Sequence, residues 1–141
     1  CISVLIAFLL PAHIAIALFS FPHYIPFFNS VAGGTDNGYH WAIDSNYDWG
    51  QDFNRLLDYL KENRIPEAYT SIFGLYWPDL YPECRLVPWG TRSPPPSGSY
   101  FVISAYILEN VTRQSLTGMP WFLKVQPVAR VGKTIFVYRV P

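Results

Sequence analysis

The residues best suited to chemistry lie in one short stretch, Asp44-Ser45-Asn46-Tyr47-Asp48-Trp49-Gly50-Gln51-Asp52. It places three carboxylates four residues apart in a chain that is 50% hydrophobic and only 14% charged. Such a cluster either stays solvated, caps a helix or holds a ligand. If it holds a ligand, the candidate substrate-binding residues are Asp44, Asn46, Asp48, Trp49, Gln51 and Asp52.

A calcium ion is the first ligand to consider. Asp44, Asn46 and Asp48 would occupy the first, third and fifth positions of a calcium loop. Trp49 then stands where that loop needs glycine, and Arg55 stands where it needs a bidentate glutamate. An EF-hand is therefore not predicted. No cofactor is predicted, and a looser divalent-metal site with oxygen ligands remains an alternative.

A sugar fits this set of side chains better, because carboxylates and carboxamides bond hydroxyl groups and an indole ring stacks on a sugar face. Phosphate is disfavoured, since three carboxylates would repel it at a helix N-terminus that otherwise attracts anions. Asp44 and Asp48 also have the residue types of a glycosidase pair, which needs two carboxyl groups about 5 to 9 Å apart. The structural alternative is that Asp48 caps a helix, Trp49 packs in the core, and Asp44 and Asn46 bond the turn backbone.

A strand before the stretch and a helix after it would position these side chains where ligands bind in open α/β sheets. The aromatic and β-branched run Tyr39–Ile43 predicts the strand. The helix is predicted over Asp48–Asn63, with Asp48 as N-cap and Gln51 completing a capping box. Its apolar face is Trp49, Phe53, Leu56, Leu57 and Leu60, at spacings of three and four. With a second strand over Ala68–Phe73, these elements make a βαβ unit.

The second half of the chain predicts further strands. Leu75–Ser99 is predicted as a Pro-rich loop with interleaved aromatic residues. Tyr100–Leu108 is predicted as a strand, and Pro120–Val125 as a short helix. Thr134–Val140 is predicted as the final strand, paired with Val128–Val131 in a hairpin. The predicted fold class is therefore α/β.

The start of the chain is apolar enough to cross a membrane. Residues 1–35 contain no Asp, Glu, Lys or Arg, and residues 1–22 have about the length that spans a hydrocarbon core of roughly 30 Å. A signal peptide would need a basic leader, which is not visible. Residues 1–22 are predicted as a transmembrane helix, residues 23–39 as an aromatic interfacial linker, and residues 40–141 as a soluble α/β domain.

Charge gives the expected side of the membrane and limits the partners. The first basic residue is Arg55, far from the apolar segment, and cytoplasmic flanks are normally rich in Lys and Arg. The domain is therefore predicted to be extracytoplasmic. Net charge is zero, so nucleic acid is not a predicted partner. Because the chain opens inside the apolar segment, without Met, we expect it to be the end of a larger protein.

Several patches of the sequence resemble one family, bacterial polytopic glycosyltransferases of the GT-C type, similar to protein mannosyltransferases and aminoarabinose transferases. The patches are His23-Tyr24, Phe28-Asn29, Gly33-Gly34, Asn37-Gly38-Tyr39, the stretch 44–52, and the tail over 127–132 and 135–138. The stretch 44–52 is the specific part. Phe53 stands where Leu is common, Ser30 where Glu is common, and the Pro-rich loop has no counterpart.

The resemblance implies an integral-membrane enzyme that transfers a sugar from a polyprenyl-phosphate-linked donor. It implies that this chain is the last span plus a periplasmic domain that assists binding of a glycan or protein acceptor. The family's catalytic carboxylate lies in an early loop that this chain lacks. No catalytic residue is therefore assigned, and the chain alone is expected to be inactive. The alternative is a non-enzymatic extracytoplasmic binding or scaffolding domain whose acidic turn is structural.

Overall fold

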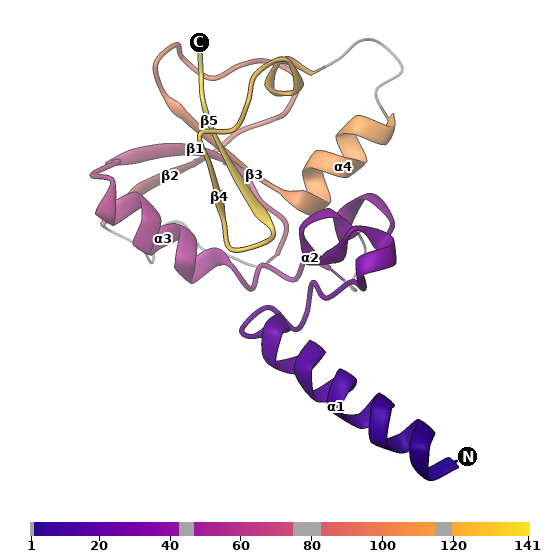
Figure 1. Ribbon diagram of the computed structural model, residues 1–141. Coiled ribbons are helices and arrows are strands. Elements are labelled where there is room, and N and C mark those ends of the chain that lie inside the picture. The colour runs from indigo at the N-terminus through magenta and orange to yellow at the C-terminus, as the bar shows by residue number, and fades with distance from the viewer. Residues whose placement is uncertain (1, 43–46, 75–82, 115–119) are drawn as a thin grey trace.

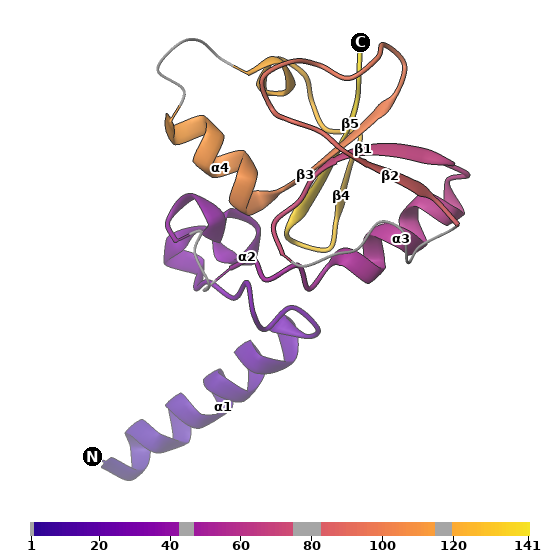
Figure 2. The same cartoon turned by 180° about the vertical axis from the view of Figure 1, so that it is seen from behind.

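The computed structural model describes residues 2–42, 47–74, 83–114 and 120–141. It has three parts, which Figure 1 shows in order from the N-terminus. Helix α1 (Ile2–Ser20) projects alone. A lobe of short helical turns follows, and beyond it lies a five-stranded mixed sheet. The lobe lies between α1 and the sheet in both views (Figures 1 and 2).

Helix α1 has no buried residue, and its ends carry no acidic or basic side chain. By length and composition it is apolar enough to cross a bilayer, and no other helix among the described residues passes that test. The side chains of His13 and Ser20 bond to carbonyl oxygens one turn earlier, at 2.9 and 2.7 Å. Such internal bonds satisfy polar side chains where no water is present.

The lobe replaces the strand predicted over Tyr39–Ile43. It consists of η1 (Ser30–Ala32), α2 (Gly34–Asn37) and η2 (Gly38–His40). That strand prediction is wrong through residue 42, and Ile43 lies outside the described residues. The aromatic signal arises instead from packing, because the Tyr39 ring contacts the rings of Tyr47 and Phe136. The βαβ unit therefore does not form with that first strand.

The sheet has the strand order β2-β1-β3-β5-β4. Strand β1 (Glu67–Ser71) runs parallel to both β2 (Arg85–Pro88) and β3 (Tyr100–Ser104). Strand β5 (Ile135–Arg139) runs antiparallel to β3 and to β4 (Ala129–Val131). The mixed α/β class and the C-terminal hairpin are thus confirmed.

Three elements differ from the prediction by more than two residues. Strand β2 lies inside the segment predicted as a loop, at the sheet edge, where a terminal proline such as Pro88 is tolerated. The predicted strand Tyr100–Leu108 ends at Ser104, and helix α4 (Ala105–Gln114) begins at once. Helix α3 (Phe53–Glu62) begins five residues after the predicted N-cap, Asp48. The short helix predicted near residue 121 is present as η4 (Trp121–Lys124).

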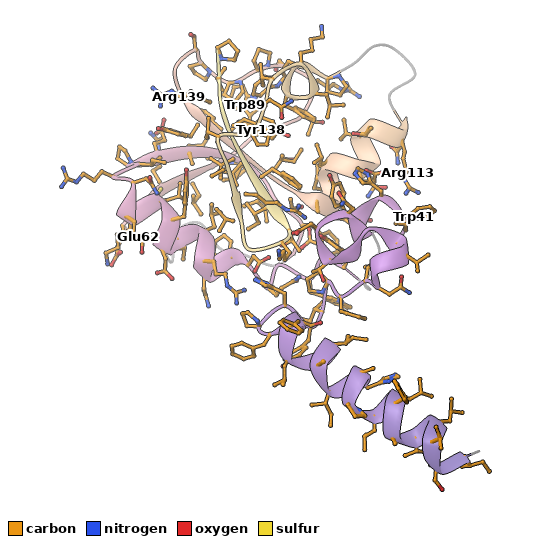
Figure 3. All side chains as sticks on the ribbon, viewed as in Figure 1. Trp41, Glu62, Trp89, Arg113, Tyr138 and Arg139 are labelled. Atoms are coloured by element: carbon orange, nitrogen blue, oxygen red, sulfur yellow. The ribbon has the colours of Figure 1, made fainter. Side chains whose placement is uncertain are left out.

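A helix packs on each face of the sheet. Helix α3 buries Phe53, Leu56 and Leu60 against one face, in a core that includes Ala68, Leu86, Val102 and Val137. On the other face, α4, η4 and the lobe cover an aromatic core that includes Tyr47, Phe101, Phe122, Phe136 and Tyr138. Figure 3 shows Trp89 and Tyr138 at the end of the sheet remote from α1.

Candidate functional site

The described part of the acidic stretch, residues 47–52, lies at the carboxyl ends of β1 and β3. Gly50 lies against the backbone just after β1, where an added Cβ would be 3.3 Å from the Phe73 carbonyl oxygen. Asp48 reaches the backbone just after β3, where its Oδ2 accepts a 3.2 Å bond from the Tyr106 N–H. Residues 47–52 thus lie at the ends of β1 and β3, and not at the end of the strand that was predicted before the stretch. Asp44 and Asn46 lie outside the described residues.

Asp48 caps a helix, but not the helix predicted. Its Oδ1 accepts a 3.0 Å bond from the Gly50 N–H, which closes a local turn. Its Oδ2 accepts from Tyr106, the second residue of α4, so the carboxylate satisfies a donor of that helix's first turn. Burial raises the pKa of Asp48, and the bonds from Gly50, Tyr106 and the Ser104 hydroxyl oppose that rise. The side chain is fully buried.

Asp52 holds the turn between β4 and β5. Its Oδ2 accepts from the Lys133 N–H at 2.8 Å, the Thr134 N–H at 3.0 Å and the Thr134 hydroxyl at 3.0 Å. Its Oδ1 pairs with the Arg55 guanidinium. Asp52 is the N-cap residue of α3 by position, yet its side chain makes no bond to that helix's backbone. The carboxylate therefore joins the start of α3 to a hairpin 81 residues away.

Gly132 is required where Asp52 meets the hairpin. Its φ is +58°, in the left-handed region that side chains disfavour. A Cβ added there would lie 2.1 Å from the Asp52 Cγ. The carboxylate and the glycine are therefore matched in shape, and neither can be replaced by a larger residue without movement of the other.

Gln51 departs from its predicted capping role, and Trp49 departs from the core position of the structural alternative. Gln51 does not complete a capping box, because its Oε1 accepts from the Trp49 N–H at 2.7 Å and its Nε2 donates to the Tyr47 carbonyl oxygen at 2.9 Å. The structural alternative placed Trp49 in the core, but the residue is 61% exposed. The helix period that placed it inside begins only at Phe53. Gln51 thus holds the turn that presents an exposed indole ring.

Tyr47 is a buried residue that the sequence analysis did not single out. Its hydroxyl lies within donating distance of two carbonyl oxygens, 2.7 Å from that of Thr35 and 3.1 Å from that of Lys133. The Arg130 Nη2 donates to the same hydroxyl at 3.0 Å. Burial raises the pKa of Tyr47 to about 12. No short-range pattern connects Tyr47 to Arg130, and their only sequence signal was that both lie in patches of the resemblance.

Charged residues surround this junction. Lys133 Nζ donates to Asp36 Oδ1 at 2.6 Å, and this bond lowers the pKa of Asp36. Arg130 Nη2 donates to the Asp36 carbonyl oxygen at 2.8 Å. His23, half-buried between α1 and the lobe, has a pKa lowered mainly by burial. The network therefore connects α2 in the lobe with the hairpin of β4 and β5.

A second polar cluster joins the lobe to α4. Glu109 is buried, accepts a 2.9 Å bond from Arg113 Nε, and lies 3.2 Å from His40 Nδ1. Arg113 also donates to the His40 carbonyl oxygen. Each of the three residues bonds to another member of the cluster, and we interpret the cluster as a structural link.

The arrangement limits what the acidic stretch can do. Asp48 and Asp52 are inaccessible and their oxygens are bonded, so neither is placed to donate a proton to a substrate or to hold an ion. Within the described residues, no group of three or more His, Cys, Asp or Glu side chains is placed to bind a metal. Of the described candidates, Trp49 alone presents most of its side chain to solvent.

Comparison of the chain with protein-family models, with curated proteins and with solved structures finds no match.

Proposed function

We propose that this chain is the membrane-anchored, extracytoplasmic α/β domain of an integral-membrane glycosyltransferase. The enzyme would transfer a sugar from a polyprenyl-phosphate-linked donor, and this domain would help bind the glycan or protein acceptor. The observation that carries the proposal is α1, which is 19 residues long, uncharged and without a buried residue. A helix with that much apolar surface is stable when lipid covers it.

Trp49 is the residue that we assign to acceptor contact. Its ring is exposed at the carboxyl ends of β1 and β3, the edge of parallel strands where ligands bind in α/β folds. Gln51, Asp48 and Asp52 are assigned as positioning residues, because their polar atoms bond the turn, α4 and the hairpin. No residue of this chain is assigned to the chemical step.

The alternative is a non-enzymatic extracytoplasmic binding or scaffolding domain. The hydrogen bonds of Asp48 and Asp52 favour this alternative, because they explain the presence of both carboxylates without any ligand. The two proposals share the anchor and the fold, and they differ in whether sugar transfer depends on Trp49.

A comparison of two exposed tryptophans tests the proposal. Trp49→Ala and Trp41→Ala each remove an exposed indole, 61% and 69% exposed, but Trp41 follows η2 and lies on the lobe. Both would be made in the whole protein, and transfer measured in membranes supplied with polyprenyl-phosphate-linked mannose or aminoarabinose. We expect Trp49→Ala to raise the KM for acceptor with kcat little changed, and Trp41→Ala to leave acceptor KM at the wild-type value.

Transfer that is unchanged in Trp49→Ala would remove the assigned contact. Absence of any transfer by the wild-type protein from either donor would favour the scaffolding alternative instead.

A further inference from the structure

We infer that the segment 21–41 is a rigid collar that rests in the bilayer interface and holds the α/β domain at a fixed height above the lipid. The collar presents Phe21, Tyr24, Ile25, Phe27, Val31 and Trp41. The inference rests on the proposed function only in taking α1 to lie in lipid. It develops the interfacial linker expected over residues 23–39 into a folded docking surface.

The distribution of exposed apolar side chains is the first argument. Outside α1, eight large hydrophobic side chains in the described part of the chain are exposed, and six of them lie in the collar. Val31 is 96% exposed and Trp41 69%. The other two, Trp49 and Val128, are separate in the sequence. A concentration of this kind marks an interaction surface, and it is continuous with the apolar surface of α1.

The collar is folded onto the domain, which is the second argument. The Phe28 ring covers Gly38 so closely that a Cβ there would lie 2.1 Å from the ring. The same ring packs on Tyr47, with centroids 6.0 Å apart. Asn29 binds the backbone of η1, because its Oδ1 accepts from the Ala32 N–H at 3.0 Å. Phe28, which follows the exposed Phe27, thus packs inward on the domain, and we expect the collar to move with the sheet.

The position of the charges gives the third argument. No charged residue precedes Asp36. Asp36 itself pairs with Lys133 at 2.6 Å, and Arg130 donates to the Asp36 carbonyl oxygen. An uncharged aromatic band followed by a charged layer is the order of groups found across a membrane interface. The lobe also lies between α1 and the sheet in both ribbon views, and Trp41 points away from the sheet (Figures 1, 2 and 3).

Two features of the collar favour lipid as its occupant. The one Asp, Glu, Lys or Arg residue of the collar is Asp36, and it is paired with Lys133, so the collar has no unpaired charge with which to select a protein partner. Its exposed groups are rings and aliphatic chains that follow the end of an uncharged helix without interruption.

Depth-dependent quenching tests the inference on the whole chain in phosphatidylcholine vesicles. A single cysteine, carrying the fluorophore NBD, would replace Val31, Trp41, Val128 or Phe8 in turn. Cys1→Ser is included in every variant. Cys84 is buried and burial raises the pKa of its thiol, so it should stay unlabelled under native conditions. Val128 is the matched control because it is an exposed valine, 54%, that precedes β4 at the end away from the hairpin turn.

The expected result is that lipids brominated near the headgroup remove most of the emission at positions 31 and 41 and leave position 128 unchanged. Aqueous iodide should act in the reverse order. Quenching of positions 31 and 41 by iodide alone would overturn the inference, because the collar would then lie in water. Protection from both quenchers would also overturn it, because protein, either another helix or a second copy, would then cover the collar.

Position 8 separates this failure from failure of the proposed anchor. Phe8 lies on α1 and is 76% exposed. If lipids brominated deep in the acyl chains quench a label at position 8, while lipids brominated near the headgroup leave positions 31 and 41 unquenched, the anchor stands and the collar does not. If the label at position 8 is also unquenched, α1 is outside the membrane and the proposed function fails first.

Discussion

Removal of the Asp52 carboxylate should lower the free energy of unfolding of the domain more than a substitution at the surface does. Asp52→Ala leaves two backbone N–H groups and the Thr134 hydroxyl without their acceptor. Thr134 is fully buried, as is the carboxylate. It also leaves the Arg55 guanidinium unpaired, although that group is 41% exposed and can return to water.

The expected loss can be estimated from these contacts. A hydrogen bond to a charged group contributes about 1.5–3 kcal/mol, and a buried donor left unsatisfied costs about 1–3 kcal/mol. These terms are not additive, because the three donors share one oxygen. We therefore expect Asp52→Ala to lower the free energy of unfolding by about 3–5 kcal/mol, the range found when one partner of a buried pair is removed. Asp52→Asn keeps one acceptor oxygen and should cost about 1–2 kcal/mol.

Urea unfolding of the whole chain in a mild detergent, followed by tryptophan fluorescence, measures this loss. The matched control is Asp58→Ala, which removes an exposed carboxylate from the same helix. It should change the free energy of unfolding by no more than about 0.5 kcal/mol. Hydrogen exchange adds a local readout, since the amides of Lys133 and Thr134 should lose protection in Asp52→Ala. If Asp52→Ala proved as mild as Asp58→Ala, the hairpin would not depend on this carboxylate.

Three further changes test the same contacts. Gly132→Ala should cost about 3 kcal/mol or more, because it combines a positive φ with a Cβ 2.1 Å from Asp52; Gly34→Ala, at φ +73° with nothing within 4 Å, should cost only about 1–2 kcal/mol in the same urea titration. Asp48→Ala should cost about 1–2 kcal/mol and expose the Tyr106 amide to exchange, and unchanged protection of that amide would contradict the assigned cap. The pKa of Tyr138 is raised to about 12 by burial, so its contribution to stability is complete below about pH 10 and is lost as pH rises toward 12, a loss of about 2–3 kcal/mol. Circular dichroism against pH should therefore show Tyr138→Phe unfolding at higher pH than wild type, whereas identical curves would mean that Tyr138 titrates normally.

Patterns in the local sequence predicted those helices and strands whose formation depends on nearby residues alone. The spacing of Phe53, Leu56 and Leu60 gave α3, because those side chains form a single buried stripe. The charge-free start gave α1, and the alternation around Gly132 gave the β4–β5 hairpin. Each of these signals lies within about 20 residues of sequence, which is the range over which patterns are informative.

The errors arose where tertiary contacts decide. Tyr39 has strong strand propensity, yet it packs as part of the lobe on Phe136, almost a hundred residues later. Strand β3 ends at Ser104 because α4 begins there, and the Asp48 carboxylate that caps α4 comes from 58 residues earlier. Trp49 was placed in the core by a helix period that does not yet apply at that residue. No spacing rule gives such pairings.

The contacts between distant segments also change what the resemblance can mean. Its specific part is the stretch 44–52, and its tail patch runs through 127–132. In the structure these two patches meet: Asp52 binds the turn that follows Gly132, and Tyr47 accepts a bond from Arg130. The requirements of folding alone would therefore explain why the Asp52 carboxylate, Gly132 and the buried Tyr47 hydroxyl occur together in these patches.

A loss of sugar transfer in an Asp52 or Gly132 variant would therefore not separate a role in the enzyme from a failure to fold. Trp49 permits that separation, because an exposed ring contributes little to the core and its removal should leave the unfolding curve unchanged. Reduced transfer with unchanged stability at Trp49, measured beside reduced stability at Asp52, is the combination that would assign acceptor binding to this edge of the sheet. Wild-type transfer in Trp49→Ala, with the stability loss confined to Asp52, would leave the acidic stretch a purely structural joint.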